Sequence, residues 1–267
     1  MRIPFAQIDA FADAPFTGNP AAVMPLTAWL DDATLQAIAA ENNLSETAFL
    51  VSDGVAADFA LRWFTPAAEV ALCGHATLAA GHFVLSSGDA RTRVTFATRQ
   101  AGVLEVARVD AGYTLALPAW TPAAKDLGDV AATLGVADPV ATLWHDKGYA
   151  LIVAADAHAV RALDPSPAAL ATLEPMVAVI TAPGDADSAS DIVSRVFTPG
   201  FGIHEDPVTG SAHAVAVPYW AERLGRTRFN AFQASARGGR LSCSLEDNRV
   251  VLGGACVTVI EGTFLLP

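Results

Sequence analysis

The chain carries two copies of one short motif, and the distance between them constrains the fold more than any other feature. The motif RWFTP at residues 62–66 returns as RVFTP at 195–199, an offset of 133 in a chain of 267 residues. Each copy is followed by an acidic loop and an Ala-rich segment that begins with small residues. A strand–turn–strand pattern then follows at 99–118 and again at 236–255. Repetition in the same order is typical of an internal duplication, so we predict two similar domains.

Each half predicts strands, a central helix and further strands. In the first half, strands are expected within 6–26, at 46–51 and at 58–64, with a turn at 16–20. Residues 31–43 predict a helix with Asp31 or Asp32 at its N-cap. The segment 75–85 is apolar nearly all round, which is typical of a buried helix. We therefore expect an α+β fold in which a barrel-like, mostly antiparallel sheet surrounds a central helix in each domain.

A Pro-rich segment at 118–139, with a short predicted helix at 126–136, separates the two halves. Domain boundaries fall in segments of this kind. We place the boundary near residue 119, which gives domains of 1–119 and 120–267. The last strand is left free to return to the N-terminal domain.

Charge and composition exclude several classes of partner. The net charge is −12 and no basic stripe is present, which argues against a nucleic-acid partner. No run approaches the about 18 apolar residues of a membrane helix, and the segment 1–15 lacks the apolar core of a secretory signal. The three cysteines are odd in number and far apart, as in a reducing compartment. We expect a cytoplasmic protein with neither a nucleic-acid nor a membrane partner.

The starts of the two Ala-rich segments are candidate anion sites. The sequences CGHA at 73–76 and TGSA at 209–212 place Gly74 and Gly210 where a helix would begin. The first amide groups of a helix lack partners within it, and the helix dipole favours an anion there. Thr209 or Ser211 could instead be an ordinary N-cap. Two such starts at equivalent places raise the weight of the binding interpretation.

Acidic residues lie close to both turns. Glu205 and Asp206 precede the second helix, where a carboxylate could orient a substrate, accept a proton, or only stabilise the helix through its dipole. Pro207 stiffens the loop and fixes where Asp206 points. Glu46 lies where a predicted strand begins, a position typical of catalytic groups, although a solvated turn acid would lie there too.

Cys73 and His75 flank Gly74. A thiol just before a helix start can act as a base, and a two-base racemase would need one in each half. Thr209 occupies the equivalent place in the second half, which excludes a symmetric two-thiol mechanism. Cys73 is then either a packing residue or the base of a one-thiol racemase. His75 could be a proton shuttle, a hydrogen-bond donor to the substrate, or a structural residue.

The spacing of the other candidates argues against a metal or a nucleotide cofactor. The acids and histidines at 204–213 match no helix-based zinc motif, and Pro207 interrupts them. The segment GFGIHE at 200–205 lacks the third glycine of a dinucleotide loop. We predict no cofactor and no metal.

Five segments lie in order over nearly the whole chain: DAFADAPFTGNPAAV, NLSETAFL, RWFTPAAEVALCGHATLAAG, EDPVTGSAH and QASARGG. Together they resemble the PhzF-like phenazine biosynthesis family, which belongs to the diaminopimelate epimerase-like fold superfamily. The resemblance implies two similar domains with the active site in the cleft between them, catalysis without cofactor or metal, and a homodimer.

The resemblance also implies roles for individual residues. Glu46 matches the general acid/base of the family, and Gly74 and His75 match its glycine–histidine pair. Asp206 matches the cleft aspartate, and Ser211 the nearby serine. In the phenazine enzyme the glutamate takes a proton from a dihydro-hydroxyanthranilate ring and helps to return it elsewhere. The related epimerases place two cysteines beside the substrate carbon, and this chain keeps one.

We therefore predict a cofactor-independent isomerase that moves a proton on a small carboxylated substrate. The predicted catalytic residues are Glu46, His75 and Asp206. The predicted substrate-binding residues are Gly74, Gly210, Ser211 and Cys73. Two alternatives stay open, a non-catalytic binding or scaffold protein on the same fold and a one-thiol racemase that uses Cys73.

Overall fold

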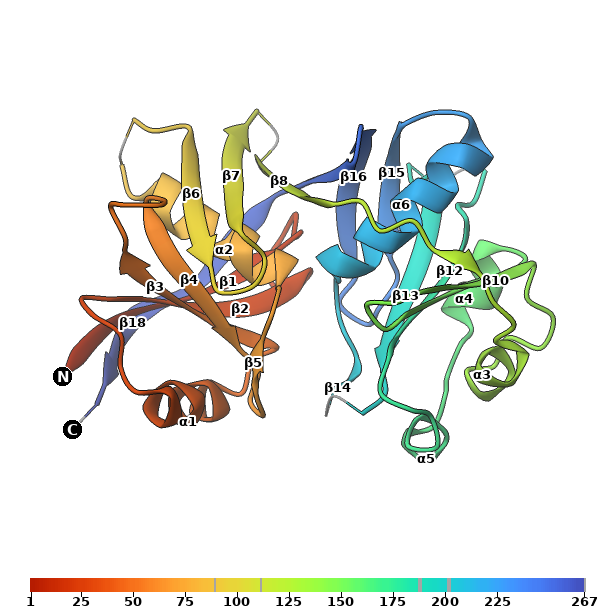
Figure 1. The fold of residues 1–267 in the computed structure, drawn as a ribbon, viewed down its shortest axis with the longest axis horizontal. Coiled ribbons are helices and arrows are strands. Elements are labelled where there is room, and N and C mark those ends of the chain that lie inside the picture. The colour runs from red at the N-terminus through yellow and green to blue at the C-terminus, as the bar shows by residue number, and fades with distance from the viewer. Residues whose placement is uncertain (89, 111, 187–188, 201–202, 267) are drawn as a thin grey trace. The chain divides into compact units, whose positions relative to one another are not determined.

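The computed structural model describes residues 1–88, 90–110, 112–186, 189–200 and 203–266. The chain forms two compact units (Figure 1). Unit 1 holds Met1–Ala116 and Gly253–Pro267, and unit 2 holds Leu117–Leu252. The chain passes from unit 1 to unit 2 between Ala116 and Leu117, close to the expected boundary at residue 119. Residues 253–267 belong to unit 1 and not to the C-terminal domain, because the last strand pairs with the first.

Unit 1 consists of strands with two helices between them. The strands are β1 (Arg2–Ala10), β2 (Asn19–Leu26), β3 (Glu46–Ser52), β4 (Phe59–Phe64), β5 (Glu69–Val70), β6 (Arg93–Thr98), β7 (Val103–Val109), β8 (Gly112–Pro118) and β18 (Cys256–Leu265). The helices are α1 (Asp32–Asn42) and α2 (Gly74–Ser86). The predicted strands and both predicted helices of this half are confirmed, whereas the two-residue strand β5 gave no pattern in the sequence.

The sheet of unit 1 is mostly antiparallel. Strand β1 is antiparallel to both β18 and β2, which brings the two ends of the chain together. Strand β2 is parallel to β3, and β3 is antiparallel to β4. Strand β4 pairs with β5 antiparallel and with β6 parallel, and β6, β7 and β8 continue antiparallel. The parallel β2–β3 pair matters for the site, because it brings the starts of two strands side by side.

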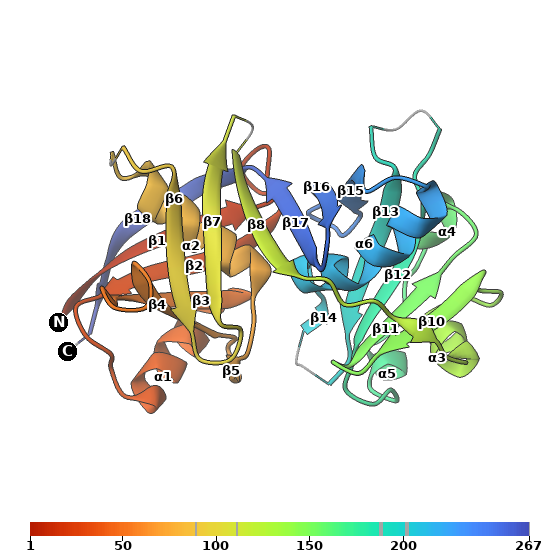
Figure 2. The same cartoon turned by 45° about the horizontal axis from the view of Figure 1, so that its top comes forward.

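Helix α2 is buried along its length, as its apolar sequence predicts. Ten of its residues are buried, and it contacts β1, β2, β3, β6, β7 and β18. In both views α2 lies behind β6 and β7 (Figures 1 and 2). A Cβ at Gly81 would lie 2.4 Å from Val106 on β7, so this glycine permits the close approach of helix and strand.

Helix α1 covers a different part of the sheet of unit 1. Asp31 is its N-cap, with its carboxylate accepting from the Thr34 N–H, and Asn43 ends the helix in the left-handed conformation. Its apolar face lies in a cluster of buried residues, Ile3, Met24, Leu35, Ile38, Ala39, Phe49 and Phe64. The two helices therefore account for the burial of both faces of β2.

Unit 2 contains the remaining elements. The strands are β9 (Ala123–Ala124), β10 (Ala141–His145), β11 (Tyr149–Val153), β12 (Val177–Pro183), β13 (Ile192–Thr198), β14 (Ile203–Glu205), β15 (Arg228–Gln233), β16 (Gly239–Glu246) and β17 (Arg249–Gly254). The helices are α3 (Gly128–Thr133), α4 (Ala157–Arg161), α5 (Pro167–Leu170) and α6 (Gly210–Leu224).

The pairings of unit 2 follow the same order as those of unit 1. Strand β11 is parallel to β12, and β12 is antiparallel to β13. Strand β13 pairs with β14 antiparallel and with β15 parallel, and β15 is antiparallel to β16. Strands β11 to β16 thus repeat the directions of β2 to β7. The chain is a mostly-sheet α+β protein, as predicted.

Helix α6 is the counterpart of α2 in this order. It contacts β11, β12 and β16 and lies across β12 and β13 in Figure 2. The short helices α3, α4 and α5 contribute to a separate apolar cluster with β11, β12 and β13. The sheet of unit 2 is therefore also covered by helices on both faces.

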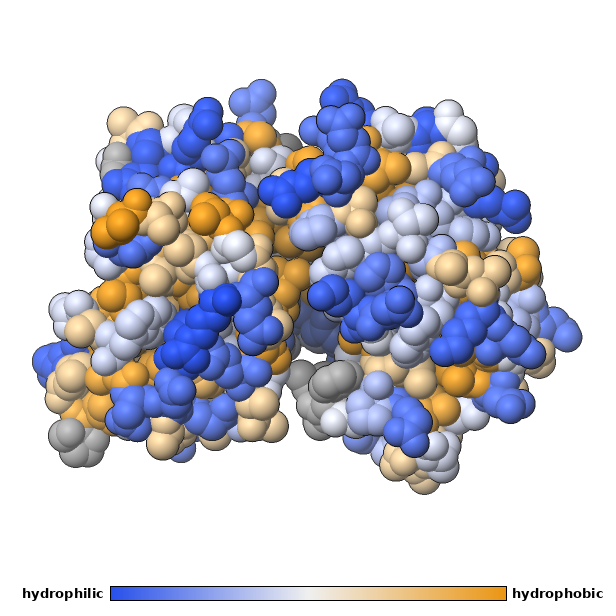
Figure 3. Space-filling model, viewed as in Figure 1, coloured by the Kyte–Doolittle hydropathy of each residue, from blue (hydrophilic) through white to orange (hydrophobic). Residues whose placement is uncertain are grey.

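The surface is polar over much of each unit. Hydrophilic residues cover most of the face in Figure 3, with small hydrophobic patches between them. No helix in the described ranges has both the length and the hydropathy that a membrane crossing requires.

Candidate functional site

Helices α2 and α6 begin differently from α1, α4 and α5. Those three helices start with a side chain that accepts from a first-turn N–H, supplied by Asp31, Asp156 and Ser166. The N-cap residues of α2 and α6 are Cys73 and Thr209, and neither side chain makes a capping hydrogen bond. The expectation that Thr209 or Ser211 is an ordinary N-cap is therefore wrong. The starts of α2 and α6 retain the anion-binding character of an uncapped helix.

Parallel pairing of β2 and β3 brings two polar side chains to the start of α2. Ala21 on β2 lies opposite Glu46 on β3. Because strand side chains alternate, Asn19 emerges on the same face as Ala21 and therefore as Glu46. Helix α2 packs against this part of the sheet. The topology alone thus directs Asn19 and Glu46 toward the first turn of α2.

Glu46 and His75 form the centre of this cluster. Glu46 Oε2 lies 3.1 Å from His75 Nε2, an ion-pair distance. The two groups are not aligned as a hydrogen bond, and both atoms are buried without a hydrogen-bond partner among the described residues. Exposure is 4% for the His75 side chain and 14% for Glu46. Buried polar atoms are usually hydrogen-bonded, which makes this carboxylate–imidazole pair a candidate site for a ligand or a proton.

The other ring nitrogen of His75 has two neighbours. Asn19 Nδ2 lies 3.1 Å from His75 Nδ1 and, being a donor only, donates to it. Cys73 Sγ lies 3.5 Å from the same nitrogen. Asn19 is fully buried and Cys73 nearly so. In this arrangement Nδ1 is the acceptor, so the proton of the neutral ring is on Nε2, the nitrogen that faces Glu46.

The backbone before Asn19 allows no larger residue at position 18. Gly18 has a φ of +67°, and a Cβ there would lie 2.2 Å from the Ala10 carbonyl oxygen. The chain must pass this close to β1 for β2 to begin at Asn19. The glycine in the GNP segment therefore fixes where the Asn19 side chain starts.

The electrostatics of the cluster raise the pKa values of both the imidazole and the thiol. Burial alone would lower the pKa of His75, but its contacts with Cys73 and with the Glu46 carboxylate outweigh burial and raise the pKa well above 6.5. Burial, and next the charge of Glu46, raise the pKa of the Cys73 thiol to about 11. Cys73 is therefore a thiol at neutral pH and a poor base.

The same three side chains are the metal-ligand candidates of the described residues. One ligand atom each from Glu46, Cys73 and His75 lies within 4.8 Å of the other two. The carboxylate meets Nε2 of the ring and the thiol lies nearest Nδ1, so no single nitrogen is well placed for both partners.

The start of α6 is built from a different set of groups. The Thr209 hydroxyl donates to the Asp206 carboxylate. Gln233 is fully buried; its Oε1 accepts from the Thr209 N–H at 2.8 Å, and its Nε2 donates to the Asp206 carbonyl at 2.7 Å. The Ser235 hydroxyl donates to the Pro207 carbonyl at 2.8 Å. These bonds hold the DPVT turn in one conformation and fix the Asp206 carboxylate.

In each unit one arginine, paired with a glutamate, anchors the hairpin that precedes the central helix. Arg62 donates through Nε and Nη2 to both oxygens of Glu69, at 2.8 and 2.7 Å. Arg195 makes the same two-bond contact with Glu205, at 2.7 and 2.8 Å. Both arginines are the first residues of the repeated R-x-F-T-P motif. Glu205 is therefore an anchoring residue, and Asp206 is the acid of this pair that remains a candidate for substrate contact.

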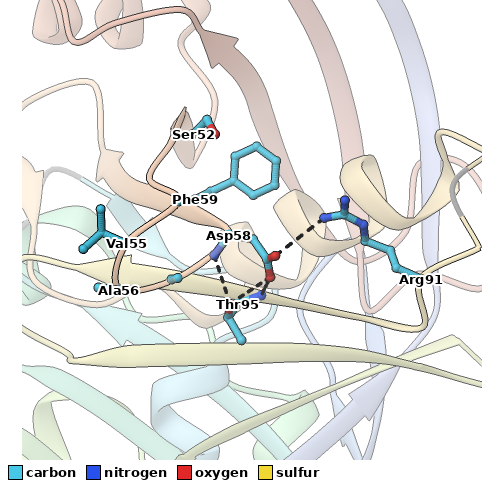
Figure 4. Close-up of a pocket in the computed structure, with 9 residues that line it drawn as sticks. Ser52, Val55, Ala56, Asp58, Phe59, Arg91 and Thr95 are labelled. Atoms are coloured by element: carbon cyan, nitrogen blue, oxygen red, sulfur yellow. Dashed lines mark hydrogen bonds and ion pairs between the residues drawn. The ribbon is translucent and has the colours of Figure 1, made fainter.

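A surface pocket of about 470 Å³ lies elsewhere in unit 1. Figure 4 shows that Asp58 contacts both Thr95 and Arg91 in this pocket. Asp58 accepts from the Thr95 N–H and hydroxyl, which lowers the pKa of Asp58, and it lies 3.8 Å from Arg91. This arrangement ties the loop before β4 to β6. It lacks the buried polar atoms without a partner that distinguish the Glu46 cluster.

Comparison with known proteins identifies the family. The family described as phenazine biosynthesis-like protein matches residues 8–262. The chain belongs to this phenazine biosynthesis-like family. A curated relative in Pseudomonas aeruginosa, named as an uncharacterized isomerase, is 47% identical over the whole of both chains. The resemblance to the phenazine biosynthesis family is confirmed, and three curated relatives are named as isomerases.

Solved structures agree with the family assignment. A PhzF-family phenazine biosynthesis protein from Enterococcus faecalis is 41% identical and matches with a TM-score of 0.90 over all of both chains. A hydroxyproline epimerase from Agrobacterium vitis matches with a TM-score of 0.64 over 98% of this chain and 92% of its own, at 12% identity. That second likeness shows the fold alone. The epimerase-like fold predicted from the sequence is confirmed at this level.

The structure brings the predicted residues of this family member into two groups. Glu46, Cys73, Gly74 and His75 lie together in unit 1. Asp206, Gly210 and Ser211 lie at the start of α6 in unit 2. Their catalytic and binding roles stay predictions.

Sequence reasoning missed two buried residues that position these groups. Asn19 lies in the predicted turn at 16–20, and Gln233 begins the segment QASARGG. Each is an amide at one end of a strand, next to apolar residues, and that position is the signal that marks it.

Proposed function

We propose that this protein is an isomerase that moves a proton between two atoms of a small carboxylated substrate, with Glu46 as the acid/base and without a cofactor. Membership of the phenazine biosynthesis-like family supports the reaction class, since a relative that matches the whole chain is named as an isomerase. The resemblance of NLSE to the family's acid/base motif supports the choice of Glu46.

One observation carries the proposal. Glu46 Oε2 and His75 Nε2 are both buried, lie 3.1 Å apart, and have no hydrogen-bond partner among the described residues. General acid/base catalysis needs a group that can lose and regain one proton at a fixed position. A carboxylate beside a protonated imidazole provides such a group.

The proposed reaction is balanced without an oxidant or a metal. The Glu46 carboxylate takes a proton from an acidic C–H of the substrate, and the electron pair stays on the substrate as an enolate-like anion. The Glu46 carboxylic acid then returns the proton to a different atom, which gives the isomer. The Nε2–H of His75 stabilises the negative charge as it passes between Glu46 and the substrate.

The helix starts provide the proposed anion contacts. The uncapped first turn of α2 at Gly74 would hold negatively charged substrate oxygens, close to the Glu46–His75 pair. For Asp206, Gly210 and Ser211 we propose substrate-orienting roles. Cys73 would line the site as a neutral thiol, because the pKa of about 11 leaves little thiolate at neutral pH.

Solvent deuterium uptake tests the proposal. Wild-type protein in D₂O would be incubated with small carboxylated amino and hydroxy acids, beginning with dihydro-hydroxyanthranilate, and uptake measured by mass spectrometry. We expect uptake into at least one compound, and a fall of about 10²- to 10⁴-fold in Glu46→Gln, the usual contribution of a general acid/base. Glu41→Gln, which removes an exposed carboxylate on α1, is the matched control and should exchange at the wild-type rate.

The two alternatives give different results in the same assay. In a one-thiol racemase Cys73→Ser would abolish exchange, whereas the acid/base proposal expects most activity to remain. A non-catalytic binding protein would retain a compound without exchange in any variant. Full exchange in Glu46→Gln would show that the assigned base is wrong.

A further inference from the structure

Asn19 makes the one side-chain hydrogen bond from an amide to the His75 ring among the described residues. Its side chain is fully buried, and the chain before it passes so close to β1 that a Cβ at Gly18 would lie 2.2 Å from the Ala10 carbonyl oxygen. Asn19 comes from β2, Glu46 from β3 and His75 from α2, so three elements hold the ring between an amide and a carboxylate.

We propose that Asn19 is the positioning residue for His75, because its amide can satisfy Nδ1 in both protonation states and keeps Nε2, 3.1 Å from Glu46 Oε2, on the side of that carboxylate. The consequence for catalysis rests on the proposed function, whereas the hydrogen bond and its effect on the ring do not. Asn19 would touch neither substrate nor proton, so it acts only through His75.

An amide suits this task because it has a donor and an acceptor at almost the same position. When the ring is neutral, Asn19 Nδ2 donates to Nδ1, as the structure has it. When the ring is charged, Nδ1 carries a proton and needs an acceptor. A half-turn of the amide places Oδ1 there with little change of volume. A carboxylate could serve only the charged ring, and an apolar residue could serve neither state.

Few ionisable side chains lie on the elements around His75 and could change its pKa. Helix α2 contributes Cys73 at its start and His82 further along, and β3 contributes Glu46. On β1, Asp9 accepts from the Phe16 N–H at 3.0 Å, and β2 has no ionisable residue. The ionisable side chains of the other strands that contact α2 are those of Arg93, Glu105, Arg108, Cys256 and Glu261. Arg108 and Glu261 act on His82, away from the first turn.

Nuclear magnetic resonance of the ring tests the proposal without any substrate. Protein labelled with ¹⁵N-histidine would be titrated with pH, and the His75 ring nitrogens assigned by their loss in His75→Gln. Asn19→Leu removes the hydrogen bond that the amide donates to the neutral ring and the one that it accepts from the charged ring. The bond to the charged ring is the stronger of the two. Its loss should lower the pH at which His75 titrates by about one unit. Asn19→Asp accepts only, so that pH should rise and the charged ring should be retained.

Controls separate positioning from general damage. Asn230→Asp adds a charge at an exposed position on β15 of unit 2 and should leave the His75 titration unchanged. Circular dichroism would show whether each variant is folded. If Asn19→Leu does not fold, Asn19→Asp still decides, because its predicted shift has the opposite sign.

The result that would overturn the proposal is a His75 titration unchanged in both folded Asn19 variants. Where the wild type exchanges deuterium, the pH profile of exchange should move with the ring titration in each variant, and an unmoved profile would also count against positioning. If no compound exchanges in the wild type, the proposed function fails, but the ring titration still decides the role of Asn19.

Discussion

The starts of α2 and α6 share a backbone design but hold different chemistry. Both helices begin at a glycine after an N-cap residue whose side chain makes no capping bond. Position by position, Cys73 corresponds to Thr209, and His75 to Ser211. At α2 the surrounding groups are a thiol, an imidazole and a carboxylate, and two buried atoms have no hydrogen-bond partner among the described residues. At α6 the Asp206 loop is held by a network of hydroxyl and amide bonds.

The two helix starts therefore share a backbone arrangement and differ in the side chains around it. The α2 turn lies beside groups that can exchange a proton, whereas the α6 turn lies beside groups that fix a carboxylate in place. The residue before the helix glycine is Cys73 at the first turn and Thr209 at the second. This asymmetry is the basis for proposing proton transfer at the first turn and substrate orientation at the second.

The first test of the difference between the two helix starts is to neutralise one acid at each of them. Glu46→Gln removes the proposed base and should lower the deuterium exchange rate by about 10³-fold. Asp206→Asn keeps the size and one acceptor and should cost only about tenfold, the value of one hydrogen bond in the transition state. The two rates would be measured with the same substrate at saturation. Equal losses would mean that both halves transfer protons.

The second test is to compare the effect of pH on stability at the two turns. The pKa of His75 is raised, so its contribution is complete below 6.5 and is lost as the pH rises through the folded value. The pKa of Cys73 is raised from 9.0 to about 11, so a further loss of about 3 kcal/mol is expected between these values. Burial lowers the pKa of His213, so its contribution is lost as the pH falls below 6.5.

Urea unfolding, followed by hydrogen exchange in each unit, would measure how the stability of each unit changes with pH. Unit 1 should weaken on the alkaline side. Cys73→Ser should remove the Cys73 part of the loss above pH 9 and leave the part from Cys256, because burial also raises the pKa of that thiol, to about 12. Cys243→Ser, a buried thiol of unit 2, is the matched control and should leave unit 1 unchanged. A unit 1 whose stability did not fall between pH 9 and 11 would contradict the assignment of Cys73 as a buried neutral thiol.

The third test is to remove the arginine that anchors each hairpin. Arg62→Gln and Arg195→Gln each leave a partly buried glutamate without its two-bond partner. We expect each unit to lose about 2 kcal/mol, less than for a fully buried pair because Glu69 is 28% exposed and Glu205 20%. Lysine at either position should recover only part of this, since it cannot make the planar two-bond contact. Denaturant midpoints would measure both losses, and a loss in one unit alone would show that the two hairpins are not equivalent.

The repeat in the sequence predicted much of this architecture. The motif copies at 62–66 and 195–199 predicted matching strands and helices, because apolar periodicity and turn residues act locally. Glu46 and His75 could be named, but their 3.1 Å contact could not, since it depends on the parallel pairing of β2 and β3. The roles of Asn19 and Gln233 could not be predicted, for the same reason. Each is a polar residue whose partner lies on an element distant in the sequence.

The last and smallest expected effects concern the fourth residue of each helix. Thr77 Oγ1 donates to the Cys73 carbonyl at 2.5 Å, and His213 Nδ1 donates to the Thr209 carbonyl at 2.8 Å. Both side chains thus make the same bond back to the N-cap residue. Thr77→Val keeps the shape and removes the donor, so unit 1 should lose about 1 kcal/mol. The denaturant midpoint of unit 1 would measure this loss.

His213→Leu should behave differently in the same measurement. It removes the equivalent bond, but it also removes Nε2, which is buried without a hydrogen-bond partner among the described residues. These two changes offset each other, so the stability of unit 2 should change by less than about 0.5 kcal/mol. A loss equal to that of Thr77→Val would make His213 a structural cap. An unchanged stability with slower deuterium exchange would mean that Nε2 is kept for the substrate, and the orienting half would then contain a second histidine of the site.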